Sequence, residues 1–168
     1  KPIARTRLVE LLWPDISETQ GKARMRHALH VLRQALAPRS DILIVDSDRL
    51  AINAGEAQVD VVSMLHEGEG EIDDEMCLAL HRGTLLDDLR SRMEGPLGEW
   101  FEHWRQRLNL RMDQCRTRLV TGLLGKNQLR DALRHAHHWV QVWPEEESCY
   151  RILIDVLVRT GRYEEARK

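Results

Sequence analysis

Apolar and small residues recur after 34 positions in the last third of the chain. The first set is Leu119, Leu123, Leu129 and Ala132, and the second is Leu153, Leu157, Tyr163 and Ala166. A period of 34 with a proline between the units, here Pro144, is typical of tetratricopeptide-like helix pairs, which stack because one pair cannot bury its apolar face alone. The repeat therefore predicts a mainly α chain that ends in a helical-repeat domain.

The stretch before the repeat also has helical periodicity. From about residue 96, apolar residues advance in steps of three and four, which predicts a long helix with one apolar face. They are Leu97, Trp100, Phe101, Trp104, Leu108, Met112, Cys115, Leu119 and Leu123. The tryptophans of this helix, like Trp139 and Trp143, are expected in the core rather than in a ligand cage.

Between residues 59 and 75 the pattern is weaker. A short helix is predicted from Val59 to Leu65, after a boundary near residues 54–57. Residues 67–75 follow, and eight of these nine are Asp, Glu or Gly. We interpret them as a solvated loop rather than as an acidic recognition segment.

The first third of the chain has a different organisation. A short helix is predicted over residues 5–13, and it ends at Trp13 because the proline that follows restricts that residue. A turn is predicted over Asp15 to Thr19, and then a second helix over residues 20–36, which Pro38 stops. Its apolar residues have the spacing of a buried stripe: Met25, Ala28, Leu29, Leu32 and Leu36.

Two short strands are predicted after the second helix. Residues 41–53 contain an aliphatic run, a polar Asp46-Ser47-Asp48 turn and a second run from Arg49 to Ile52, which is the pattern of a β-hairpin. Two helices followed by a hairpin are the parts of a winged helix-turn-helix. The expected fold is therefore a partial winged helix over residues 1–55, followed by the helical-repeat domain over residues 56–168.

The second helix carries cations and imidazoles on the side opposite its leucines. At 100° per residue, that side holds Ala23, His27, His30 and Gln34, and basic residues border it. An α-helix fits the major groove of DNA, where polar side chains contact base edges and Arg and Lys neutralise phosphates. The alternative is a solvated basic surface. The predicted DNA-binding residues are Lys22, Arg24, Arg26, His27, His30, Arg33, Gln34 and, on the hairpin, Arg49.

The charge distribution supports that placement. The whole chain has a net charge of -2, but residues 1–53 hold nine Lys and Arg against six Asp and Glu, a net charge of +3. A basic first third joined to an acidic remainder places a polyanion-binding surface in the first third.

Several stretches of the sequence resemble a known family. The stretches that carry the resemblance are Arg7-Leu-Val-Glu-Leu-Leu-Trp-Pro-Asp15, residues 23–36, residues 43–52, the segment Leu80-His-Arg-Gly-Thr-Leu-Leu-Asp-Asp-Leu89 and Trp100 to Leu108. They are similar to the SARP-type bacterial activators, in which an OmpR-type winged helix precedes a bacterial transcriptional activator domain. Members carry a small sheet and a first helix before the residues that begin here, and a capping serine where Ala4 stands.

The resemblance implies a cytoplasmic transcription regulator. It implies that the helix over residues 20–36 is the recognition helix for double-stranded DNA, and that the helical domain mediates dimer or RNA polymerase contacts. The alternative function is a protein-interaction scaffold in which the repeats bind a partner peptide without direct DNA binding.

Other chemistry finds little support in the sequence. We expect no catalytic residues, no metal and no cofactor, because there is no phosphate-binding glycine loop and no nucleophile elbow, and the histidines 135, 137 and 138 lack helical ligand spacing. The cysteines 77, 115 and 149 are expected to be reduced core residues. No apolar run approaches the roughly 20 residues of a membrane span. The start lacks an initiator Met, which predicts a piece of a longer polypeptide.

Overall fold

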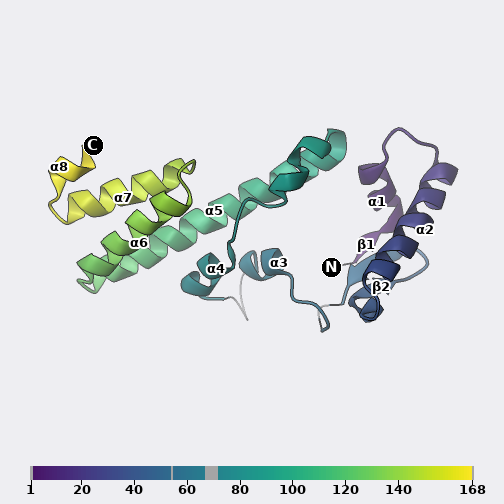
Figure 1. The fold of residues 1–168 in the computed structure, drawn as a ribbon, viewed down its shortest axis with the longest axis horizontal. Helices are drawn as coiled ribbons and strands as arrows, with labels where there is room; N and C mark the ends of the chain where they lie inside the picture. The colour runs from purple at the N-terminus through teal and green to yellow at the C-terminus, as the bar shows by residue number, and fades with distance from the viewer. Residues whose placement is uncertain (1, 54, 67–71, 168) are drawn as a thin grey trace. The chain divides into compact units, whose positions relative to one another are not determined.

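The computed structural model describes residues 2–53, 55–66 and 72–167, and they are mainly helical with a small antiparallel sheet. Its elements are, in chain order, β1 (Ile3–Ala4), α1 (Arg5–Leu12), α2 (Glu18–Ala35), η1 (Ser40–Ile42), β2 (Leu43–Val45), β3 (Arg49–Ile52), α3 (Asp60–Met64), α4 (Asp74–Leu80), η2 (Asp87–Arg92), α5 (Gly95–Gly125), α6 (Leu129–Val142), α7 (Glu147–Arg159) and α8 (Tyr163–Ala166) (Figure 1). The predicted mainly α fold class is confirmed.

The chain divides into two compact units. One unit comprises residues 1–59 and 84–105, and the other comprises residues 60–83 and 106–168. The helix α5 contributes its first part to one unit and the rest to the other.

The two helices and the hairpin predicted for the start of the chain are present. The strands β2 and β3 pair antiparallel, with Leu43 opposite Ile52 and Val45 opposite Leu50. A strand that was not predicted, β1, pairs with the other edge of β3, which gives the sheet order β1-β3-β2. At two residues, β1 is too short to show the alternation by which a strand is recognised in a sequence.

The core of this part of the chain lies where α1, α2 and the sheet meet. Met25 and Leu29 of α2 are buried together with Leu50 of β3. Partly buried residues surround them. These come from β1, from α1 and the residue after it, and from β2: Ile3, Leu8, Val9, Trp13, Leu43 and Val45. These contacts fix which side of α2 faces inward.

Gly21 marks the close approach of α1 and α2. A β carbon at this buried glycine would lie 2.3 Å from Cγ1 of Val9, well inside contact distance. Valine is β-branched and rotates little about χ1, so it cannot swing aside cheaply. The glycine therefore allows the two helices to pack closely.

Gly21→Ala is accordingly expected to destabilise this part of the chain. Overpacking costs about 1–3 kcal/mol, and the better helix propensity of alanine offsets at most about 1 kcal/mol of that. Adding Val9→Ala removes the clashing methyl group and should abolish the penalty of Gly21→Ala. Urea unfolding of the four chains in a double-mutant cycle measures this coupling. An equal cost of Gly21→Ala in both backgrounds would contradict it.

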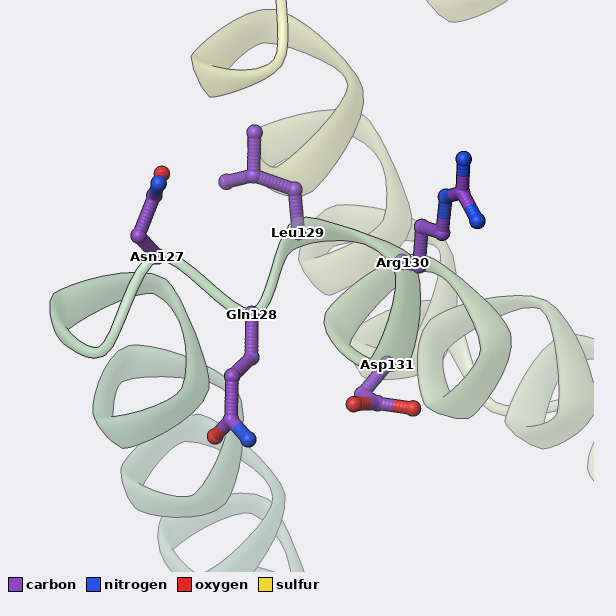
Figure 2. Close-up of a pocket in the computed structure, with 5 residues that line it drawn as sticks. All are labelled: Asn127, Gln128, Leu129, Arg130 and Asp131. Carbon is purple, nitrogen blue, oxygen red and sulfur yellow. The ribbon is translucent and has the colours of Figure 1, made fainter.

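The 34-residue repeat appears in the backbone hydrogen bonds of two helix ends. After α5, Gln128 N donates to Leu123 O at 2.8 Å, and after α7, Arg162 N donates to Leu157 O at 2.8 Å. The residue before each donor has a left-handed backbone, with φ of 57° at Asn127 and 76° at Gly161. This is the Schellman ending of a helix, repeated after 34 residues. Figure 2 shows the first of these turns, whose side chains point in different directions.

A second core lies between the helices of the repeat. Val120 of α5 is buried with three residues of α6 and two of α7, namely Ala132, Ala136, Trp139, Cys149 and Val156. The helices α6 and α7 pack against each other (Figure 1). The three cysteines are free and buried, as expected of small core residues, and burial raises the pKa of the Cys115 thiol to about 12.

The prediction that residues 67–75 form a solvated loop is wrong for the last residues of this range. Residues 67–71 lie outside the described residues, but α4 begins at Asp74, and the Asp73 carboxylate accepts a hydrogen bond from Met76 N at 2.7 Å. An aspartate at this position caps the first turn of a helix. Arg118 then donates to both carboxylate oxygens of Asp74, which lowers the pKa of that carboxyl and joins α4 to α5.

Trp143, which follows α6, has His81 and Arg116 as neighbours. The rings of His81 and Trp143 stack with centroids 4.5 Å apart, and the Arg116 guanidinium lies 6.0 Å from the Trp143 ring. Arg116 is 2% exposed and forms an ion pair with Asp113 at 3.3 Å. Burial, and then the charge of Arg116, lower the pKa of His81 to about 4.

His81 is therefore expected to make stability depend on pH. Its folded pKa lies below the unfolded value of about 6.5, so the unfolded chain binds the proton more tightly. The contribution of His81 to the free energy of unfolding is complete above about pH 6.5 and is lost as the pH falls toward about 4. Allowing for solvent screening of a partly exposed ring, the loss is about 1–2 kcal/mol.

Chemical denaturation at pH 7 and pH 5 tests this expectation. His81→Phe keeps a ring on Trp143 and removes the titrating group, so the difference between the two pH values should shrink by that amount. If both chains lose stability equally between pH 7 and pH 5, His81 does not contribute as described.

Candidate nucleic-acid interface

The helix α2 has one buried side and one exposed side. Gly21, Met25 and Leu29 are buried, at intervals of four residues. All the predicted DNA-binding residues of this helix are exposed: Lys22, Arg24, Arg26, His27, His30, Arg33 and Gln34. The packing of α2 on α1 and the sheet thus leaves the cations and imidazoles to solvent.

The helix begins two residues earlier than predicted. Ser17 is the N-cap, and its hydroxyl oxygen accepts from Gln20 N at 3.4 Å. A serine followed by glutamine three residues later is the sequence pattern of a capping box, which was the available signal for this start. Glu18 and Thr19 consequently lie on the first turn of α2 and are exposed, whereas the sequence prediction placed them in the preceding turn.

The earlier start also adds an acid to α2. The carboxylate of Glu18 lies 2.5 Å from Lys22 Nζ, one helical turn away. This hydrogen bond and the charge of Lys22 lower the pKa of Glu18. The helix therefore holds four cations and one acid, and the charge of Lys22 is partly compensated on its own helix.

Leu32 departs from the predicted buried stripe. It lies on the same side of α2 as Met25 and Leu29, yet its side chain is 43% exposed. The residues that surround Met25 and Leu29 come from α1 and the sheet, and Leu32 is not part of that cluster. Val31 is also exposed, at 48%. The apolar contact of α2 is thus concentrated in its first three turns.

Arg49 is on the hairpin rather than on α2. It is the first residue of β3, is exposed, and lies 3.9 Å from the carboxylate of Asp48. Its neighbour Leu50 packs against Met25 and Leu29. Because successive side chains of a strand alternate between faces, Arg49 lies on the face of the sheet opposite α2.

A hollow of about 740 Å³ lies beside α1 and α2. Its wall is mixed, with apolar Val9, Trp13 and Met25 and with charged residues of both signs, Lys22, Arg26, Glu10 and Glu18 among them.

The histidines of α6 do not converge. His135 is half-buried, with its ring 5.7 Å from that of Trp139, whereas His137 and His138 are exposed. Across residues 2–53, 55–66 and 72–167, no group of three or more His, Cys, Asp or Glu has the geometry to hold a metal ion. The expectation that Trp100 lies in the core is wrong, since it is 40% exposed; its ring is in T-shaped contact with those of Phe101 and Trp104.

A comparison with protein families gave a match to the second part of the chain. Residues 73–168, more than half of the chain, match the family described as the bacterial transcriptional activator domain. No curated protein and no solved structure gave a significant match. Among the described residues, no helix has both the length and the apolar character needed to cross a membrane.

Proposed function

The chain belongs to the bacterial transcriptional activator domain family, and from this membership we propose that it is a DNA-binding transcription regulator in which α2 is the recognition helix. The family is regulatory rather than catalytic. The proposal extends to a SARP-type arrangement, with residues 1–55 as part of a winged helix and the helical repeats in contact with RNA polymerase or a second copy. Such a regulator would act in the bacterial cytoplasm, where the DNA is.

One observation carries the proposal. The side of α2 away from Met25 and Leu29 is exposed along its length and holds cations at its borders with polar side chains between them. Side chains of this kind divide naturally into phosphate contacts and base contacts. The hairpin of β2 and β3 packs on the same helix through Leu50, as the wing of a winged helix would.

Within this proposal the residues of α2 have separate roles. Arg26 and Arg33 are seven residues apart, two turns on one border of the exposed side, and they would contact phosphates. His27, His30 and Gln34 lie between the borders and would contact base edges. Arg49 lies on the face of the sheet opposite α2. It would therefore contact the DNA backbone only where the DNA extends past the hairpin.

The division of roles predicts different consequences for two substitutions. His30→Ala should relax the sequence preference of the chain, because a base contact is worth about 1–3 kcal/mol of discrimination. Arg26→Ala should weaken binding to all sequences alike. Selection of bound fragments from a random DNA pool, followed by sequencing, measures the preference of each variant. If His30→Ala leaves the selected sequences unchanged and Arg26→Ala alters them, the assignment of roles is wrong.

A further inference from the structure

The exposed side of α6 is basic. The buried residues of this helix, Ala132, Ala136 and Trp139, lie on one side. At 100° per residue, all the exposed polar residues of α6 lie on the opposite side. They are Arg130, Arg134, His137, His138 and Gln141. We call these five residues the α6 stripe.

The core of the repeat does not use the α6 stripe. Val120 of α5 and Cys149 and Val156 of α7 form a cluster with the buried side of α6. A helix that continued the repeat by a further 34 residues would pack on α7 and α8, as α7 packs on α5 and α6. The α6 stripe therefore lies outside the surface through which the repeats stack.

Other exposed arginines in this part of the chain are paired on their own helix. On α7, Arg151 lies 3.9 Å from Glu147 and Arg159 lies 2.9 Å from Asp155, in each case one helical turn away. Acids are also in excess, because residues 54–168 hold 16 Lys and Arg against 21 Asp and Glu. A basic surface is therefore unusual here.

The α6 stripe lacks this compensation. The one acid of α6 is Asp131, whose carboxylate lies 2.9 Å from Arg134. Arg130 and Asp131 point in different directions (Figure 2), and across residues 2–53, 55–66 and 72–167 Arg130 forms no ion pair. From Arg130 to His138, the α6 stripe thus presents largely uncompensated donors at one-turn intervals over about 12 Å.

We infer that the α6 stripe binds an acidic helix of another polypeptide, one with carboxylates at positions i, i+4 and i+8. An arginine donates two parallel hydrogen bonds to a carboxylate. Carboxylates four residues apart repeat at the same interval as Arg130, Arg134 and His138 do on α6. This inference is independent of DNA binding by α2.

The length of the α6 stripe favours a short acidic segment over a nucleic acid. A DNA duplex carries one charge per about 1.7 Å along its axis, and it extends well past the two arginines. Beyond them it would meet a part of the chain in which acids outnumber cations. A helix with a few carboxylates on one side meets the α6 stripe alone.

The probe for this site is a synthetic peptide of five Glu-Ala-Ala-Ala repeats. Alanine favours the helix, in which the glutamates form one line. In two-dimensional NMR of the whole 15N-labelled chain at low salt, the peptide is expected to shift the amide signals of α6 saturably. Replacing Arg130 and Arg134 together by alanine should weaken binding about 5–30-fold, the loss expected for two exposed ion pairs with good geometry.

Matched controls separate this site from general charge attraction. Replacing Arg151 and Arg159 together by alanine removes the same charge from α7, where both arginines are already paired, and it should leave binding unchanged. A peptide of the same composition with its glutamates spread around the helix should bind more weakly. Circular dichroism of each variant verifies that the chain remains folded.

Three results would overturn the inference. The first is a titration in which the amides of α6 do not shift. The second is equal weakening by the α6 and α7 double variants, or equal binding of the two peptides, which would leave only general charge attraction. The third is displacement of the peptide from α6 by a DNA duplex whose binding the α6 double variant also weakens, which would assign the α6 stripe to nucleic acid.

Discussion

Leu29→Ala is expected to lower the stability of the part of the chain that contains α2 by about 2–4 kcal/mol and to abolish DNA binding with it. Leu29 is 7% exposed and packs with Met25 and Leu50, so its removal leaves a cavity at the junction of α2 and the sheet. A core this small holds little surplus stability, and a loss of this size unfolds it.

Hydrogen exchange measured by mass spectrometry distinguishes local unfolding of this part of the chain from unfolding of the whole chain. The amides of α2 and β3 should lose protection in Leu29→Ala, whereas those of α6 and α7, whose core is separate, should keep it. Leu32→Ala is the matched control, because Leu32 is on the same helix and is 43% exposed. Equal loss of protection in the two variants would mean that the buried side of α2 is not the one described.

Replacing Arg26 and Arg33 together by alanine is expected to weaken DNA binding about 10–100-fold at 0.1 M salt. Both side chains are exposed, so the chain should remain folded. Each lost phosphate contact also removes about 0.9 from the slope of log affinity against log salt concentration, so the slope should become shallower by nearly 2.

A matched pair of arginines elsewhere provides the control. Arg130 and Arg134 are exposed and one turn apart on α6. Their replacement removes the same net charge from the chain. If this variant weakens binding as much as the α2 variant does, the attraction comes from overall charge and not from α2.

The organisation of α2 was accessible from the sequence because it depends on spacing. The positions of Met25 and Leu29, four residues apart, determine which side chains point the other way, and the cations and histidines there are exposed. The 34-residue period likewise anticipated two helix ends with matching hydrogen bonds. Local periodicity was sufficient in both cases.

Features that depend on neighbours were not accessible. Leu32 has the spacing of a core residue, but exposure is decided by what covers it, and α1 and the sheet cover Met25 and Leu29 instead. The stacking of His81 on Trp143 joins residues 62 positions apart, and no pattern in the sequence connects them. Trp100 had helical spacing and is nonetheless 40% exposed.

Two other errors of the sequence prediction concern helix starts, although capping residues in the sequence mark both. The capping box at Ser17 and Gln20 marks the start of α2, and Asp73 marks that of α4. The acidic composition of residues 67–75 concealed the second of these. Capping residues therefore locate helix starts that composition alone obscures.

The central claim, that α2 presents its exposed cations to DNA, is tested most directly by the salt dependence of binding. Fluorescence anisotropy of the whole chain with a selected DNA duplex, repeated between 50 and 200 mM salt, gives the slope of log affinity against log salt concentration. With four to six phosphate contacts at about 0.9 each, we predict a slope of roughly -4 or steeper. A slope near zero, or no binding to any selected duplex at 50 mM salt, would contradict the account.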